Sequence, residues 1–98
     1  MKIIEKYNPG NKKEKRKLYT YTSGATYEGE WVGGFRDGKG EMTWKDGAKY
    51  IGEWTLNKAF GKGKFIHVEG DVYEGEWAND KANGYGTYHH VNGAVYEG

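Results

Sequence analysis

The pentapeptide YEGEW occurs at residues 27–31, YIGEW at 50–54 and YEGEW again at 73–77, and the printed chain closes with YEG at 96–98. A tyrosine, a glycine and a tryptophan therefore return at a period of 23 residues. A fixed period of this size is typical of an array of small structural units that stack on one another. The repeat thus indicates the fold class before any functional site is considered.

Alternation within each repeat predicts β-strands. Residues two apart in an extended chain share a face, so Tyr27, Gly29 and Trp31 point one way and Glu28 and Glu30 point the other. Asp-Gly and similar pairs between these runs are hairpin signals, and they predict a meander of antiparallel strands. We expect strands near residues 18–22, 25–31, 38–44, 48–54, 61–67, 71–77 and 84–90, in one antiparallel sheet.

The register follows from the turns. A three-residue loop that ends in Gly47 pairs Gly38 with Trp54 and Gly40 with Gly52. The same counting through the wider loop of the repeat, at residues 32–37, pairs Trp31 with Gly38 and Tyr27 with Met42. On the opposite face it gives a cross-strand row of alternating charge, which such pairing favours: Glu30, Lys39, Glu53, Lys62 and Glu76. We also expect one recurring positive-φ position in the wider loops, at Gly34, Asn57 and Asp80.

The recurring glycines and tryptophans make up the expected structural core of the repeats. A glycine opposite each tryptophan leaves room for the flat indole ring. The predicted core positions are Gly29, Trp31, Gly38, Gly40, Gly52, Trp54, Gly61, Gly63, Gly75, Trp77, Gly84 and Gly86.

The segment YEGEWVGGFRDGKGEMTWKDGAK at 27–49 resembles a MORN repeat (membrane occupation and recognition nexus). The resemblance covers three full repeats at 27–49, 50–72 and 73–95, with partial repeats at 18–26 and 96–98. It implies an all-β fold, a single elongated antiparallel sheet of 23-residue β-hairpin repeats. It also implies a non-catalytic scaffold or adaptor that mediates protein–protein interaction, in a cytoskeletal, ciliary or membrane-associated assembly. Residues 1–17 lie outside the resemblance, and we expect them to form a flexible basic tail.

Charge separates this tail from the array. Residues 1–17 carry seven Lys/Arg against two Glu, a net charge of +5, whereas residues 18–98 carry eight against twelve Asp/Glu, a net charge of −4. A basic tail suits anionic phospholipids, so peripheral membrane binding is the alternative function. Its expected contacts are Lys12, Lys13, Lys15, Arg16 and Lys17. The chain has no cysteine, which favours a reducing, cytoplasmic location, and the resemblance adds the cytoskeleton or cilium.

Catalytic and metal-binding patterns are weak. The stretch GGFRDGKG at 33–40 approaches a phosphate-binding loop, but Gly40 replaces the required Ser/Thr and a strand follows instead of a helix. His67 and His90 occupy equivalent positions two strands apart, or ~10 Å, too far to share a zinc ion. We expect no enzyme activity, no cofactor, no metal and no nucleic-acid partner.

The candidate partner-binding residues are a row of tyrosines on the aromatic face: Tyr27, Tyr50, Tyr73 and Tyr96. A single sheet has no second layer, so part of this face should stay accessible. The alternative for each ring is that it only covers a thin core. The C-terminal edge offers unpaired backbone groups, and we expect further repeats, a second copy or a partner chain to cover it.

Overall fold

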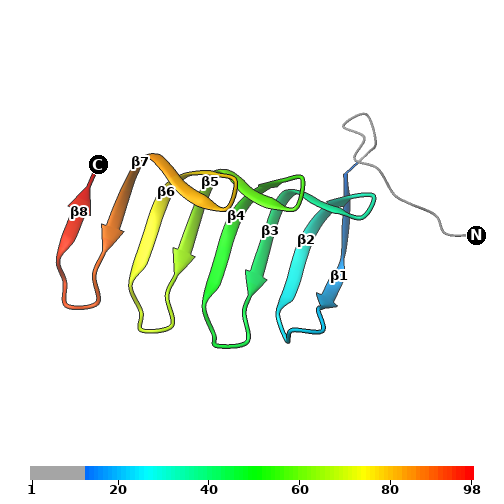
Figure 1. Cartoon of the computed structure of the whole chain (residues 1–98), viewed down its shortest axis with the longest axis horizontal. Helices are drawn as coiled ribbons and strands as arrows, with labels where there is room; N and C mark the ends of the chain where they lie inside the picture. The colour runs from blue at the N-terminus through cyan, green and yellow to red at the C-terminus, as the bar shows by residue number, and fades with distance from the viewer. Residues whose placement is uncertain (1–12) are drawn as a thin grey trace, which may run out of the picture.

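The computed structural model describes residues 13–98, which form eight β-strands and no helix. The strands are β1 (Glu14–Thr20), β2 (Thr26–Val32), β3 (Phe35–Thr43), β4 (Lys49–Thr55), β5 (Lys58–Ile66), β6 (Val72–Ala78), β7 (Lys81–His89) and β8 (Val95–Glu97). They lie in chain order in one antiparallel sheet (Figure 1). The prediction of an all-β, single antiparallel sheet is confirmed.

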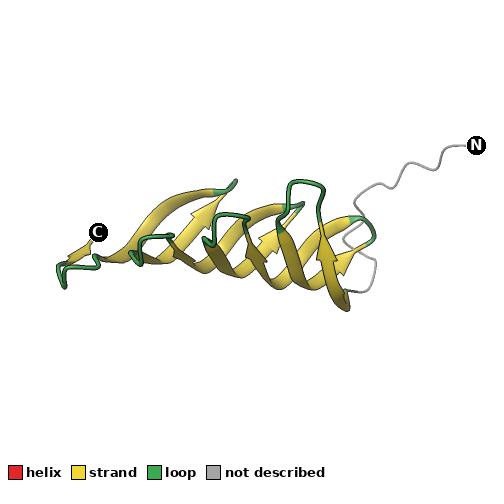
Figure 2. Cartoon of the chain, turned by 90° about the horizontal axis from the view of Figure 1, so that it is seen from below, coloured by secondary structure: helices red, strands yellow, loops and turns green. Residues whose placement is uncertain are grey.

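The sheet is an elongated single layer, with extents of 53 × 27 × 19 Å. Its strands twist and curve, and no second layer of secondary structure covers either face of the described sheet (Figure 2). The buried hydrophobic cluster lies on one face of the sheet, which we call the aromatic face, and gathers in β2, β3, β4 and the start of β5; Val32 and Asp37 are buried outside this cluster. We call the opposite face the outer face. Aromatic rings therefore have to provide the core without help from another layer.

The shorter turns, drawn at the bottom of Figure 1, agree with the prediction. Gly40 pairs with Gly52 and Gly38 with Trp54, as expected. Gly47 has a φ of 99° and donates its N–H to the Trp44 carbonyl, closing a three-residue loop. Glycine adopts this left-handed conformation without a steric penalty, which explains the turn signal.

The turns that were predicted to be wider join β2 to β3, β4 to β5 and β6 to β7, and they are tighter than predicted. Each is a two-residue loop, and β3, β5 and β7 begin at Phe35, Lys58 and Lys81, three residues before the predicted positions. Asn57 and Asp80 have the expected positive φ, whereas the positive φ of the first loop belongs to Gly33 and not to Gly34.

A bulge in each wider hairpin corrects the predicted register. Tyr27 pairs with Met42 as expected, but Trp31 pairs with Arg36 and not with Gly38. The register shifts between Gly29 and Trp31, and the same shift recurs in the next two repeats. The extra residues of β3 include Gly38, whose φ of 102° an L side chain rarely adopts.

Successive repeats are joined at the wider loops by paired hydrogen bonds. Asn57 donates its backbone N–H to the Arg36 carbonyl and accepts the Arg36 N–H at Oδ1, at 3.1 and 2.7 Å. Asp80 repeats this arrangement with Ala59, at 3.1 and 2.7 Å. The polar residues of these loops thus attach each repeat to the one before it.

A row of glycines crosses the sheet beneath the tyrosines. The paired positions are Gly29, Gly40, Gly52, Gly63, Gly75 and Gly86. The backbones of paired glycines lie so close together that a Cβ on Gly52 would lie 2.5 Å from the Gly63 Cα. The tyrosine rings lie against the second glycine of each pair, Tyr50 against Gly63 for example. The space left by these glycines therefore holds tyrosine rings. The indole rings were predicted at another glycine, Gly38, which does pair with Trp54, but a Cβ on Gly38 would meet the Glu30 side chain and not the indole.

Both ends of the sheet extend the predicted array. Strand β1 begins at Glu14, so it crosses the expected boundary between residues 17 and 18 and includes part of the basic segment. At the other end β8 pairs with β7, and Gly86 and Gly98 exchange two backbone hydrogen bonds. Both end strands are fully exposed along their length.

Candidate functional site

Tyrosine and tryptophan rings form a continuous ladder on the aromatic face. Trp54 meets Tyr27 and Tyr50 edge-on, at ring-centroid distances of 5.4 and 5.1 Å. Tyr50 in turn meets Trp77 at 5.1 Å, and Trp77 meets Tyr73 at 5.4 Å. Each inner tyrosine therefore packs between the tryptophan of its own repeat and that of the next, in the geometry that aromatic pairs prefer.

Two of the predicted partner-binding tyrosines are core residues. Tyr27 and Tyr50 are 0% and 1% exposed, and their hydroxyls donate to the carbonyls of Glu30 and Glu53. Burial raises the pKa of Tyr50 to about 12 and raises the pKa of Tyr27 further above its ordinary value. The alternative prediction, that a tyrosine ring only covers a thin core, therefore applies to both Tyr27 and Tyr50.

The other two predicted tyrosines remain accessible. Tyr73 is half-buried, and its hydroxyl donates to the Glu76 carbonyl at 3.3 Å. Tyr96 is 62% exposed and meets Tyr88 at a centroid distance of 6.5 Å. Exposure therefore increases from the second repeat toward the C-terminal end of the sheet.

A hollow opens on the aromatic face over the second repeat, with further walls from the first and third repeats. We call it the aromatic hollow; its volume is ≈ 350 Å³. Trp44, Phe65 and Trp77 are its more accessible walls, because Trp44 is exposed and the other two are half-buried. The remaining lining residues are Arg36, Met42, Tyr50, Trp54, Ala59 and Asp80. A space of this size and composition suits one large apolar side chain.

A second hollow lies beside β1, and we call it the basic hollow. Its volume is ≈ 360 Å³, and Arg36 belongs to its wall as well as to that of the aromatic hollow. The basic hollow is lined by Arg16, Lys17, Tyr19, Tyr21, Trp31, Gly34, Arg36 and Asn57. Neither hollow could be predicted from the sequence, because both depend on the bulged register that places Arg36 opposite Trp31.

The outer face carries charged side chains, and its glutamates accept hydrogen bonds from backbone N–H groups at the bulges. Glu53 accepts the Lys62 backbone N–H, and Glu30 and Glu76 accept the equivalent N–H groups of Lys39 and Tyr85. The predicted pairing of Lys39 with Glu53 and of Lys62 with Glu76 is present in the backbone register.

The ion pairs of this face join other residues than the predicted row. They are Lys49 with Glu41 and Lys64 with Glu74, each at 3.7 Å. These pairs lie at the surface, where an ion pair contributes little to stability. The glutamates of the predicted row thus stabilise the bulges, a role that the alternation of charge did not reveal.

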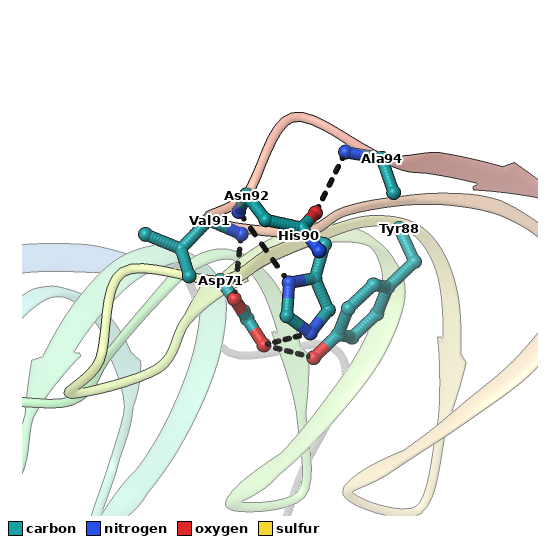
Figure 3. A network of polar contacts seen from close by, with 6 residues as sticks. All are labelled: Asp71, Tyr88, His90, Val91, Asn92 and Ala94. Carbon is teal, nitrogen blue, oxygen red and sulfur yellow. Dashed lines mark hydrogen bonds and ion pairs between the residues drawn. The ribbon is translucent and has the colours of Figure 1, made fainter.

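A polar network joins the last two of the shorter turns, at residues 67–71 and 90–94 (Figure 3). Asp71 accepts the Tyr88 hydroxyl at 2.7 Å and the Val91 backbone N–H at 2.8 Å, and its carboxylate lies 3.7 Å from His90 Nε2. The hydrogen bond from Tyr88 lowers the pKa of Asp71 below its ordinary 3.8. One sequence signal could have found this residue, because Asp71 stands where the other repeats have Ala25, Ala48 and Ala94.

The two equivalent histidines differ in their surroundings. His67 packs edge-on against Phe65 at 4.7 Å, whereas His90 lies beside Asp71. Residues 13–98 contain no group of three side chains that could hold a metal ion. Within the same residues there is no helix with the length and apolarity needed to cross a membrane.

Of the predicted lipid-contact residues, three lie on β1 and Lys13 directly precedes this strand, whereas Lys12 lies outside the described residues. Lys13, Lys15, Arg16 and Lys17 are all exposed. Lys13 Nζ lies 3.7 Å from the Asp37 carboxylate, and Arg16 donates to Glu14 while lying over the Trp31 ring.

Comparison with known families agrees with this geometry. The pattern of the MORN repeat matches residues 27–49, 50–72 and 73–95, which is more than half of the chain. The chain belongs to the MORN-repeat family. No curated protein matches it. Each matched MORN unit starts at the ladder tyrosine and ends just before the next one, so the unit of the family is the hairpin whose rings stack here. MORN repeats are in general modules that interact with proteins or membranes.

Proposed function

We propose that this protein is a non-catalytic MORN-repeat scaffold or adaptor that binds a segment of a partner protein on its aromatic face. The observation that supports this most directly is the aromatic hollow, an apolar recess of ≈ 350 Å³ on a sheet with no second layer. Large aromatic side chains at an accessible recess are the residue types that dominate protein–protein binding energy.

The contacts proposed for the partner differ from the predicted tyrosine row. Trp44, Phe65 and Trp77 take the place of Tyr27 and Tyr50, whose rings are buried. Tyr73 and Tyr96 stay in the proposal because both remain accessible. Their positions extend the surface from the aromatic hollow toward the C-terminal end of the sheet.

The wider context is also a proposal. We place the protein in the cytoplasm, in a cytoskeletal or ciliary assembly, on the basis of its MORN repeats and its lack of cysteine. The edge strand β8 is exposed at every residue, and a second copy of the chain or a further repeat would satisfy its free backbone groups. Light scattering across a concentration series measures this self-association.

Binding to anionic phospholipids is the second candidate function. Four basic residues are exposed on the edge strand β1 or directly before it: Lys13, Lys15, Arg16 and Lys17. A basic residue near an anionic membrane contributes ~1 kcal/mol. The net charge of −4 on residues 18–98 opposes this attraction. Cosedimentation with phosphatidylserine vesicles should therefore be weak, fall with salt and disappear when these four residues are changed to Ser.

Site-specific crosslinking tests the proposed protein-binding face. A photoreactive benzoylphenylalanine replaces Trp44 on the aromatic face or, as the matched control, Ile51 on the outer face; the two residues are 37% and 42% exposed. We expect irradiation in cells to give a discrete protein adduct from position 44 and none from position 51. An adduct from position 51 alone would contradict the proposal, because the partner would then contact the outer face.

A further inference from the structure

The basic hollow has the composition of a site for an anionic group. In the part of the chain that the structure describes, three cationic side chains line it, from Arg16, Lys17 and Arg36, and no carboxylate does. Arg16 is partly engaged, because it donates to Glu14 at 3.1 Å. Aromatic rings from Tyr19, Tyr21 and Trp31 supply the walls. Cations held against apolar walls attract an anion more strongly than cations fully surrounded by water.

Arg36 is the cation that the fold holds in place most firmly. Its guanidinium lies 4.7 Å from the Trp54 ring centroid, and its Nε and Nη2 atoms donate to the Oδ1 and backbone carbonyl of Asn57. The Nη1 amino group makes no hydrogen bond within the described residues. The equivalent positions in the next two repeats are Ala59 and Ala82, so the stacking of repeats does not require an arginine here.

Trp31 provides a second, independent sign that a polar group is missing. In the following repeats Trp54 and Trp77 donate their indole N–H to the carbonyls of Gly40 and Gly63, at 3.1 and 3.0 Å. The Trp31 Nε1 is buried and has no acceptor among residues 13–98. Strand β1 shifts its register between Arg16 and Tyr19, so the equivalent carbonyl does not reach it. A buried donor without a partner is costly, and a bound acceptor removes that cost.

We propose that the basic hollow receives an acidic side chain of an extended partner segment, and that a neighbouring apolar side chain of this segment enters the aromatic hollow. Arg36 lines both hollows, so it would lie between the acidic and the apolar side chain of the bound segment. A guanidinium binds a carboxylate through paired, charge-assisted hydrogen bonds. The proposal rests on the proposed function and adds a sequence preference for the partner, an acidic residue close to an aromatic or aliphatic one.

The two-part geometry favours a peptide over a lipid surface. Each hollow is large enough to hold one side chain, and the two share Arg36 as a wall on the same face. A membrane would instead contact the protruding lysines of β1, and it would leave the aromatic hollow unused. Anionic vesicles therefore serve as the competing probe in the test.

Selection from a random dodecapeptide library on the whole chain tests the inference. We expect the selected peptides to share an Asp or Glu near an aromatic or aliphatic residue. Arg36→Ala should weaken their binding about tenfold or more. Changing the peptide's acidic residue to its amide should weaken binding to the wild type equally and binding to Arg36→Ala little. In the wild type the Trp31 indole proton should move downfield in NMR spectra as the peptide binds.

The controls separate folding and lipid binding from recognition. Arg36→Ala introduces the residue found at positions 59 and 82, and its thermal unfolding shows whether the sheet is intact. The inference would be overturned, and the proposed function would stand, if the selected peptides showed no preference for an acidic residue while substitutions at Phe65 still weakened their binding. Peptides that bind only the outer face would overturn both. Loss of binding to phosphatidylserine vesicles, but not to peptides, in Arg36→Ala would show that the guanidinium serves a lipid, and the inference would be wrong.

Discussion

Truncation of Trp54 should be the most damaging single change in the ladder. The indole is 4% exposed, meets two tyrosine rings edge-on, carries the Arg36 guanidinium on its face and donates to the Gly40 carbonyl. Removing a buried aromatic side chain costs about 3–5 kcal/mol, which includes the cavity left behind. A chain of this size has a free energy of unfolding of about 5–15 kcal/mol, so Trp54→Ala removes a large fraction of it.

Urea denaturation followed by circular dichroism measures this loss. With an m-value of about 1–3 kcal/mol/M, the expected shift of the midpoint is roughly 2 M. Trp44→Ala is the matched control, because this tryptophan is 37% exposed and lies outside the buried cluster; its cost should stay below about 1 kcal/mol. The reasoning fails if Trp54→Ala costs no more than Trp44→Ala, since the ladder would then not be the core of the sheet.

Three further changes test separate parts of the structure. Tyr50→Phe leaves the Glu53 carbonyl without its donor and should lower the free energy of unfolding by about 1 kcal/mol, measured by the same urea titration. Leu56 has a φ of 52° in an exposed loop, so Leu56→Asn should raise the melting temperature and the free energy of unfolding by about 1 kcal/mol; an unchanged or lower value would contradict the assigned backbone conformation. The hydrogen bond from Tyr88 holds the pKa of Asp71 below 3.8, so its contribution to stability is present above that pH and is lost as the pH falls through the lowered pKa; NMR titration should show this pKa rising toward 3.8 in Tyr88→Phe.

The sequence predicted the repeat and the shorter turns well because their signals are local. Gly47 requires a particular backbone conformation, and this fixes the pairing of Gly40 with Gly52 across the turn. The bulge in the wider hairpin was not predictable by counting residues. It depends on the Glu30 carboxylate, which accepts the Lys39 backbone N–H and stabilises the extra residues of β3.

The candidate site was predicted at the level of the face but not of the residues. A row of tyrosines on a single sheet suggested accessible rings, yet Tyr27 and Tyr50 are covered by the neighbouring tryptophans. Two large rings can bury each other without a second layer when glycines let them lie against the backbone. Arg36 departs from the alanine that the next two repeats carry at this position, Ala59 and Ala82, but its place opposite Trp31 follows from the bulge and could not be predicted.

Chemical-shift mapping with the crosslinked partner segment tests the central claim, that the aromatic face binds protein. The isotope-labelled chain is titrated with the synthetic segment recovered from the adduct at position 44. We predict that the largest shifts fall on Trp44, Phe65 and Trp77 around the aromatic hollow. Shifts confined to outer-face residues such as Ile51 and Thr87, with the three aromatic residues unchanged, would contradict the account.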